Sequence, residues 1–520
     1  MNSQKYLWGV LLCAASFSAC QKGSDNRSLI QGNGDRFTQT EITDQKVVLN
    51  PGGYAPLSCS IDLKTNKLTR ATIRVSGKHG SNSDVVKVFD ELDSIHHLDV
   101  LGLYAAYQNT VELDLYDIDN HLLGKSAIWV QTEAAPTVLP QITINKSSAA
   151  QRPGMNLVSY WGKNETRNGQ VPFIFDEYGD LRWYLDFNTH PALKNLVYDD
   201  GMERLRNGNW YFGDISSGQI YEVDMMGNIL NTWPLQANGY TFHHEVYEKP
   251  DGNFLVTVTK NGLATVEDHI IEIDRNTKAI INVWDLRQSL QPSRNTLTAD
   301  ISDWIHVNAV WYDETDNTIL VSGRTQGVVK LDQGNHVVWI LGPHRGWGIA
   351  GDGTDLSTKL LTPLDATGNK ITDTSVLNGW TNDPGFEWNW YQHAIKKNQA
   401  GHYTMFDNGD NRNFSGFGTY SRALEFAIDP VNRTVQQVWS YGKSRGAETF
   451  SRIVSDVDFY PDVNHVIFSP GASVDVAGYY GKIVELDYSS QAILFEATLR
   501  LAGNLTIITH HRTERLSLYP

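Results

Sequence analysis

A short motif occurs six times between residues 174 and 495, and this repetition limits what the chain can fold into. Each copy is an apolar run ending in Asp, a turn, and a second run that often ends in Trp. The copies read IFDEYGDLRW (174–183), YEVDMMGNILNTW (221–233), IEIDRNTKAIINVW (271–284), VKLDQGNHVVW (329–339), FAIDPVNRTVQQVW (426–439) and VELDYSSQAILF (484–495). Their aspartates, Asp176, Asp224, Asp274, Asp332, Asp429 and Asp487, are spaced 48, 50, 58, 97 and 58 residues apart. A period of about 50 residues with four strand-like runs per unit is typical of a β-propeller. The six copies therefore predict an all-β, six-bladed propeller over residues 143–520.

The longest spacing, before Asp429, contains an excess segment at about 343–385. It is rich in glycine and lacks periodicity, so we interpret it as a long loop over one face of the propeller. The alternative fold, a sandwich of unrelated hairpins, explains the shared register of Asp, turn and Trp less well. The last segment, residues 505–518, has no copy of the motif. We expect it to complete the first blade, so that no sheet edge stays open.

The residues before the repeats fall into three parts. Residues 1–19 resemble a secretory signal, with Lys5 followed by an apolar stretch (6–15) too short to span a bilayer. Phe17-Ser-Ala-Cys20 then predicts a lipobox in which Cys20 is acylated, although an ordinary signal peptide cut nearby is the alternative. Residues 20–37 are polar and rich in Gly, Ser and Asn, as in a flexible tether. Residues 38–135 alternate at period two between turns, which predicts a small β-sandwich, and residues 132–142 form a linker. We expect the protein to be lipid-anchored on the periplasmic side of the envelope, at the outer membrane.

Composition excludes several classes of function. The 520 residues carry a formal net charge of −16, which argues against nucleic acid as a partner because phosphates need clustered Lys and Arg. Three cysteines exclude a disulfide-rich scaffold and an all-cysteine zinc site. Cys13 would be removed with the signal and Cys20 would be lipidated. Cys59 would then be the one remaining thiol, so the mature chain could form no internal disulfide.

A second repeated pattern places polar residues on the innermost strands, which line the channel of a propeller. Alignment on the apolar residue two places onward makes His244, Asn308 and His393 equivalent. His306 lies two residues before Asn308, on the same strand face, and Arg324 lies on the next strand. Imidazoles, an amide and a guanidinium without a carboxylate indicate an anion site for a tetrahedral sulfate or phosphate. An imidazole in such a site can also be a nucleophile or a general base.

Alternatives remain open at this site. Any single histidine can be a hydrogen-bonded core residue, and three histidines could bind zinc or copper. Because Arg324 would repel a cation, we predict no metal ion and no cofactor. The repeat register favours His244 over His243 as the residue that faces the channel. The string DNGDNR (407–412) resembles a calcium loop only loosely, and we interpret it as a turn at the channel mouth.

Several strings resemble the bacterial arylsulfate sulfotransferases. They are NPGGYAPL (50–57), FHHEV (242–246), HVNAV (306–310) with Arg324 eighteen residues after its His, YQHAI (391–395) and DNGDNR. The resemblance implies a six-bladed propeller behind a β-sandwich. It also implies transfer of a sulfuryl group from an aryl sulfate donor to a phenol acceptor, without a nucleotide donor, through a sulfohistidine.

By motif, His393 matches the histidine that is sulfurylated, and Asn308, His306 and Arg324 match residues that hold the sulfate oxygens. His244 matches a further site histidine, our candidate general acid and base. Well-known members carry a disulfide near the active site, and this chain has no cysteine there. The oligomeric state stays open, with a homodimer as one option.

Three other functions use a similar pocket. A lipid-anchored propeller could bind an anionic aromatic ligand without turnover. An aryl sulfatase-like hydrolase is less favoured because the string Cys/Ser-x-Pro-x-Arg is missing near the site. A quinone-dependent dehydrogenase would need carboxylates on a calcium ion.

Overall fold

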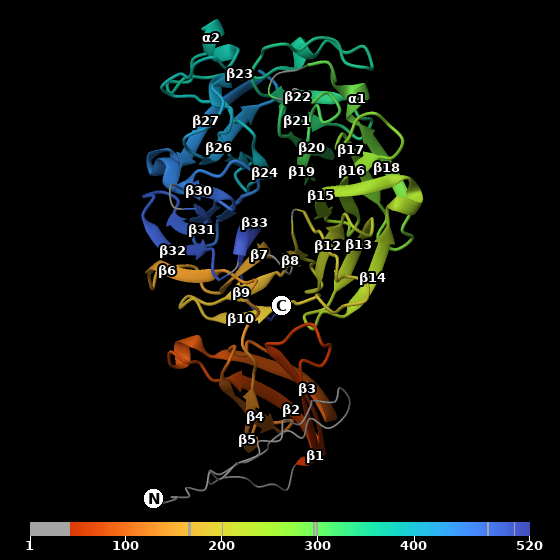
Figure 1. Ribbon diagram of the computed structural model, residues 1–520, viewed down its shortest axis with the longest axis vertical. Coiled ribbons are helices and arrows are strands. Elements are labelled where there is room, and N and C mark those ends of the chain that lie inside the picture. Colours follow the sequence, from red (N-terminus) through yellow and green to blue (C-terminus); the bar gives the residue numbers. More distant parts are fainter. Residues whose placement is uncertain are drawn as a thin grey trace, which may run out of the picture.

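The computed structural model describes residues 42–164, 168–199, 201–294, 297, 300–475, 478–503 and 505–519. The expected signal peptide, the lipidated Cys20 and the tether therefore lie outside the described residues. Figure 1 shows a small β domain, coloured red to orange, next to a larger body of sheets arranged around a centre. In the described part of the chain, no helix has the length and apolar character needed to cross a bilayer.

The small domain is one five-stranded sheet. It contains β1 (Ile42–Leu49), β2 (Ser58–Val75), β3 (Val85–Leu101), β4 (Gln108–Tyr116) and β5 (Leu122–Gln131). The first half of β2 pairs with β1 and its second half with β4, while β3 pairs along both halves. One long strand thus serves both halves of the domain. Cys59 is a free thiol in its core, where burial raises the pKa to about 12, so the thiol is unreactive.

The described residues from Gln141 onward form six further sheets in chain order, the number that six copies of the motif predict if each is one blade. Their strands are β6 (Gln141–Ser147), β7 (Met155–Asn164), β8 (Asn168–Gln170), β9 (Phe173–Phe175), β10 (Leu181–Tyr184), β11 (Glu203–Arg204), β12 (Trp210–Asp214), β13 (Gln219–Val223), β14 (Ile229–Pro234), β15 (Tyr240–Glu248), β16 (Phe254–Lys260), β17 (His269–Ile273), β18 (Ile280–Asp285), β19 (Val307–Asp313), β20 (Thr318–Gly323), β21 (Gly327–Leu331), β22 (Val337–Leu341), β23 (Thr362–Pro363), β24 (His393–Lys397), β25 (Tyr403–Asp407), β26 (Arg422–Asp429), β27 (Thr434–Tyr441), β28 (Asp456–Tyr460), β29 (His465–Ser469), β30 (Ser473–Asp475), β31 (Gly478–Asp487), β32 (Ile493–Arg500) and β33 (Leu505–Leu516). The sheets are antiparallel except for the β23–β27 pair. The fold is a β-propeller behind a small β domain, as the repeats predict.

Four copies of the repeated motif join their sheet to the next one through a Trp hydrogen bond. In the turn of the second copy, Asp224 Oδ1 accepts hydrogen bonds from the backbone N–H groups of Met226 and Asn228, both at 2.9 Å. The Trp at the end of a copy donates its indole N–H to a backbone carbonyl in the Asp turn of the following sheet. These pairs are Trp183 to Met225, Trp233 to Arg275 and Trp284 to Asp332 at 2.8 Å, and Trp439 to Tyr488 at 2.9 Å. Asp and Trp recur because one caps the turn and the other ties neighbouring sheets together.

Strands from both ends of the propeller region close the ring. β33 pairs with β7 in the first sheet, as the missing motif in the last segment predicts. In addition, β6 pairs with β32 in the last sheet. Each of these sheets therefore combines early and late parts of the chain.

The segment at 343–385 contains more structure than its composition predicts. It contains the short strand β23, the helix α2 (Thr374–Leu377) and buried side chains such as Leu361 and Val376. β23 pairs in parallel with β27, at the edge of its sheet away from β24. Most of the segment is irregular backbone, as a long loop would be, and apolar residues scattered without periodicity pack it onto the sheet.

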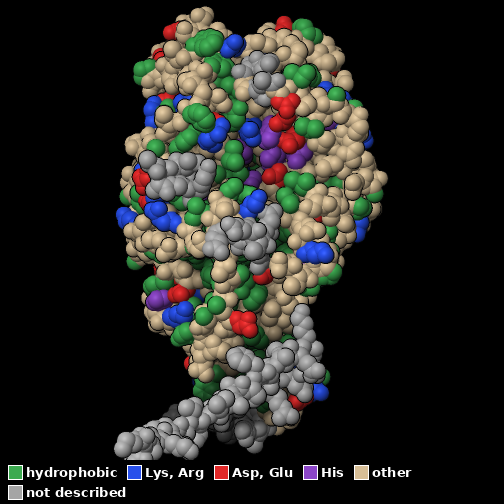
Figure 2. All heavy atoms as spheres, viewed as in Figure 1, with side chains coloured by type: hydrophobic (Ala, Val, Ile, Leu, Met, Phe, Trp, Pro, Cys, Tyr) green, Lys and Arg blue, Asp and Glu red, His purple; other side chains and the backbone are tan. Residues whose placement is uncertain are grey.

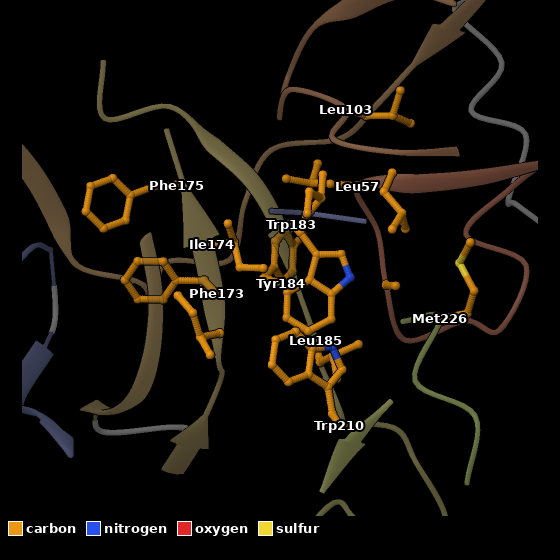
Figure 3. Packing of buried hydrophobic residues seen from close by; sticks show 14 of the residues in the cluster. Leu57, Leu103, Phe173, Ile174, Phe175, Trp183, Tyr184, Leu185, Trp210 and Met226 are labelled. Carbon is orange, nitrogen blue, oxygen red and sulfur yellow. The ribbon is translucent and has the colours of Figure 1, made fainter. Parts of the chain in front are cut away.

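The small domain packs on the propeller through a shared apolar core. Figure 3 shows Leu57 and Leu103 of the small domain close to Trp183 and Met226 of the propeller. The string 50–57 supplies this contact. A Cβ on Gly52 would lie 2.6 Å from the carbonyl oxygen of Met226, so only glycine fits there.

Candidate active site

Three innermost strands depart from regular pairing at the same level. β15, β19 and β24 lie side by side at the centre of the propeller (Figure 1). The ladder to the second strand of each sheet is interrupted around His244, Asn308 and Ala394. His244, His306 and Ala394 have φ angles of 51°, 52° and 55°, in the left-handed region that non-glycine residues rarely occupy. Such bulges and strained residues cluster at functional sites, where they redirect side chains.

His244, His306 and Arg324 are in direct contact. His244 Nε2 lies 3.1 Å from His306 Nε2, and Arg324 Nη1 lies 2.8 Å from the same nitrogen. A guanidinium can only donate, so Nε2 of His306 accepts and the ring proton lies on Nδ1. That proton is donated to Asp303 Oδ2 at 2.7 Å. The imidazoles of His244 and His306 are therefore in contact, and the guanidinium of Arg324 lies against that of His306.

Three carboxylates surround this group, although the sequence indicated a site without any. Asp199 Oδ2 lies 3.1 Å from His244 Nδ1, and Glu267 Oε2 lies 2.9 Å from His306 Nδ1. Burial alone would raise the pKa of Glu267, but hydrogen bonding to His244 and His306 outweighs it and keeps the pKa well below the usual range. The carboxylates of Asp199, Glu267 and Asp303 orient the imidazoles from behind.

His393 is held by a residue that sequence reasoning did not single out. Its Nδ1 lies 2.7 Å from Asn408 Oδ1 and 3.0 Å from the Tyr391 carbonyl. The amide of Asn408 cannot be reversed, since its Nδ2 donates to the carbonyls of Ser451 at 2.9 Å and Val454 at 3.0 Å. Nδ1 of His393 therefore carries the proton and Nε2 the lone pair, which is the form of imidazole that acts as a nucleophile.

Asn308 links His393 to the other site residues. Its Nδ2 donates to the carbonyl of Gln392 at 2.8 Å, and Ser322 Oγ donates to the same carbonyl at 3.1 Å. The residue before His393 is thus fixed to β19 and β20, the strands that precede Arg324. Asn308 Oδ1 is buried and has no hydrogen-bond partner among the described residues.

His243 and the 407–412 string have different roles from those of the site residues. His243 is fully buried next to His244, and burial lowers its pKa to about 4. The contact with His306 is made by His244, as the register predicted. In the 407–412 string, the carboxylate of Asp407 faces Arg412 at 2.8 Å and that of Asp410 faces Arg452 at 2.9 Å. Paired in this way, these carboxylates are not arranged to hold calcium.

A small cavity of about 10 Å³, enough for about one water molecule, lies beside Arg324. Its wall includes the apolar or aromatic side chains of Leu297, Trp390, Tyr391 and Phe414. The guanidinium of Arg324 lies 5.0 Å from the centre of the Tyr391 ring. Figure 2 shows histidine, acidic and basic side chains gathered in a depression near the middle of the propeller.

Four residues around the site were not predicted from the sequence, and their positions along the chain explain why. Asp303 lies three residues before His306 in the string ISDWIHVNA (301–309), and this spacing was the available signal. Asp199 and Glu267 lie between strands, outside the repeat, where the sequence offers no register to place them. Asn408 lies within the 407–412 string, where its neighbours suggested a turn.

Two family models together match nearly the whole described chain. The family described as "Arylsulfotransferase (ASST)" matches residues 130–507, and the "Arylsulfotransferase Ig-like domain" matches residues 46–133. Arylsulfate sulfotransferase AssT of Escherichia coli O6:H1 is 27% identical over 551 residues, covering 86% of this chain and 89% of that protein. AssT of Lelliottia amnigena is 27% identical over 544 residues, with the same two shares.

Solved structures that resemble this chain have low sequence identity and low TM-scores. A streptogramin B lyase structure is 12% identical, covers 70% of this chain and 98% of its own, and has a TM-score of 0.31. The Dos1 propeller is 10% identical, covers 71% and 78%, and has a TM-score of 0.30.

Proposed function

The chain belongs to the arylsulfotransferase family, and from this premise we propose that it moves a sulfuryl group from an aryl sulfate to a phenol through a sulfohistidine on His393. The observation that carries the proposal is the hydrogen bond between His393 Nδ1 and Asn408. It fixes the imidazole with its lone pair on Nε2, ready to attack sulfur without losing a proton first.

In the first step, Nε2 of His393 forms a bond to sulfur as the bond from sulfur to the aryl oxygen breaks. The imidazole becomes cationic, and its Nδ1–H remains hydrogen-bonded to Asn408 and the Tyr391 carbonyl. Sulfuryl transfer, like phosphoryl transfer, has a loose transition state with charge on three equatorial oxygens. Arg324 and the second amide hydrogen of Asn308 are the donors we assign to those oxygens, and His306 Nε2 holds the guanidinium of Arg324 in position. The leaving phenolate takes a proton from His244.

In the second step, a phenol enters, gives its proton to His244 and attacks the sulfur. The bond from sulfur to Nε2 breaks, which restores the neutral form of His393. The acidic residues Asp199 and Glu267 support this exchange because they stabilise His244 in its protonated form. The same imidazole thus serves as acid in one half-reaction and as base in the other.

Release of p-nitrophenol from p-nitrophenyl sulfate, with and without an added phenol, tests the proposal. We expect release that depends on the acceptor, and a sulfuryl adduct on His393 when the acceptor is withheld. Release without an acceptor would mean a sulfatase, and no release would mean a binding protein. His393→Asn should abolish turnover and keep aryl sulfate binding. If that variant keeps full turnover while His244→Asn loses it, the roles of the two histidines are exchanged.

We also propose that the enzyme is tethered by a lipid on Cys20 at the periplasmic side of the outer membrane. The lipobox and the polar segment after it support this location. Cys20→Ser should move the protein from the membrane fraction to the soluble periplasmic fraction, and its continued fractionation with membranes would contradict the anchor.

A further inference from the structure

The surroundings of His244 contain more negative than positive charge. Three carboxylates, those of Asp199, Glu267 and Asp303, approach the imidazoles of His244 and His306. Among the described residues, the cation in contact with these imidazoles is Arg324. The carboxylates are partly buried, with side-chain exposures of 26%, 22% and 28%. Partly buried charges are costly unless they are paired. An additional bound cation would therefore balance the excess negative charge of these carboxylates.

His243 is a potential ligand that the transfer reaction does not use. Both of its ring nitrogens are buried and have no hydrogen-bond partner among the described residues. A buried polar group without a partner costs about 1–3 kcal/mol.

We propose that His243, His244 and Glu267 form a binding site for a divalent transition-metal ion, with Zn²⁺ as the best chemical match. One ligand atom from each residue lies within 4.8 Å of the other two. His244 Nε2 and Glu267 Oε2 are 3.5 Å apart, close to the separation of roughly 3.3 Å between ligands of a tetrahedral zinc ion with bonds of about 2.0–2.2 Å. Two imidazoles and one carboxylate leave a fourth position for water.

The backbone explains how two consecutive residues reach the same ion. In a regular strand, His243 and His244 would point to opposite faces of the sheet. The interrupted ladder and the left-handed φ of His244 bring the two ring centres to 5.4 Å. A bulge at this position is therefore the feature that makes a paired histidine ligand set geometrically accessible.

A second combination of ligands is less suitable. Glu267, Asp303 and His306 also lie within 4.8 Å of one another. However, Arg324 lies 2.8 Å from His306 Nε2, and a guanidinium at that distance repels a cation. The ion is therefore assigned to the His243 side of Glu267.

Occupation of this site has a consequence for catalysis. The ion would take the lone pair of His244 Nε2 and the charge of Glu267, so His244 could no longer give or accept a proton. Zn²⁺ should therefore inhibit transfer reversibly, without covalent modification of the protein. The inhibition rests on the proposed function, whereas the metal binding does not.

The direct test is a titration of the full-length protein with Co²⁺ and Zn²⁺. We expect one ion per chain at this site and, for Co²⁺, the visible absorption of a four-coordinate ion. His243→Gln should weaken binding by at least about 10–100-fold, the range seen when even an indirect ligand contact is removed. His121→Gln is the matched control. It removes the histidine of the exposed Asp117–Asp119–His121 group, which also has metal-ligand spacing, and it should leave tight binding intact.

Several outcomes would overturn the site. They are no tight binding, wild-type affinity in His243→Gln, or loss of tight binding in His121→Gln. X-ray absorption of the wild-type zinc complex decides the question even if a variant fails to fold. Two imidazoles and oxygen ligands are expected, and fewer than two imidazoles would contradict the assignment. In the p-nitrophenyl sulfate assay, His243→Gln should keep transfer and lose inhibition by Zn²⁺. If the wild type shows no transfer, the proposed function fails, and the Co²⁺ titration still decides the metal site.

Discussion

The outer hairpins and the innermost strands of the propeller obey different rules. In the outer hairpins, Asp caps its own turn and Trp donates to the next sheet, in almost the same way from copy to copy. The innermost strands are interrupted, contain left-handed residues, and carry Asn308 Oδ1, a buried polar atom for which the described residues offer no hydrogen-bond partner. The hairpins maximise stability, whereas the inner strands hold polar groups ready for a ligand.

This contrast predicts that substitutions in the two regions affect different quantities. Changes on the inner strands should reduce the reaction rate at nearly constant stability. Changes in the hairpins should reduce stability at a nearly constant rate.

Arg324→Ala should give the largest effect. Loss of a donor to the transition-state oxygens typically lowers the rate by about 10²–10³-fold, and aryl sulfate binding should weaken as well. Steady-state kinetics with p-nitrophenyl sulfate measure both. Arg275→Ala is the matched control, because Arg275 lies in an outer hairpin and pairs with Glu248 at 2.9 Å. It should lower the melting temperature and leave kcat unchanged. Equal rate losses in both variants would remove the distinction between the regions.

Acid should destabilise the inner strands through two buried histidines. Burial lowers the pKa of His243 to about 4 and that of His510, on β33, to about 3. Between pH 7 and 4, these two imidazoles become protonated in the unfolded chain but stay neutral in the folded protein. Stability is thus complete above the ordinary histidine pKa and is lost as pH falls, by on the order of 3 kcal/mol per residue.

The measurement is urea unfolding of the wild type and of His510→Gln at a series of pH values. The side chain of Gln can keep the hydrogen bond to Ser469 Oγ that His510 makes at 3.0 Å. Glu514, whose pKa burial raises to about 7, changes stability in the opposite direction. The prediction therefore concerns the difference between variant and wild type, which should favour the variant increasingly as pH falls. A constant difference would contradict it.

Asn408→Ala should reduce the rate by about 10–100-fold, as for residues that orient a catalytic imidazole from behind. Asn408 is a positioning residue, so kcat should fall while KM stays near the wild-type value. The pH profile of kcat should also change, because the proton of His393 is no longer confined to Nδ1. An unchanged profile with only a lower melting temperature would mean that Asn408 is purely structural.

Trp284→Phe should have the smallest effect. The smaller phenyl ring leaves part of the buried site empty, and the hydrogen bond from the indole to the Asp332 carbonyl is lost. The free energy of unfolding should fall by about 1–3 kcal/mol, with transfer activity unchanged. Trp380→Phe is the control, since Trp380 is 49% exposed and should cost less. A loss of activity in Trp284→Phe would show that the hairpins and the site are coupled.

The sequence predicted the parts of the molecule that repeat. The Asp and Trp motif predicted the repeated sheets, and a second repeated string upstream of the hairpins predicted equivalent positions for His244, Asn308 and His393 on inner strands. These patterns could not place Asp199, Glu267 or Asp303, because these residues lie in connections whose lengths differ between sheets. The packing of the long loop at 343–385 could not be predicted for a related reason. Its buried residues contact the outer edge of a sheet, and such packing leaves no periodic pattern.

The joining of β33 to β7 and of β6 to β32 has a consequence for how the chain matures. The four middle sheets can form as soon as their own residues are available. The last sheet must wait for β32, and the first sheet must wait for β33, the final strand. Until β33 is available, the edge of β7 remains an open template for non-native pairing. Pairing of the final strand is therefore the last step in completing the propeller during synthesis. A chain interrupted before residue 505 would contain every proposed catalytic residue and still be a substrate for chaperones and proteases.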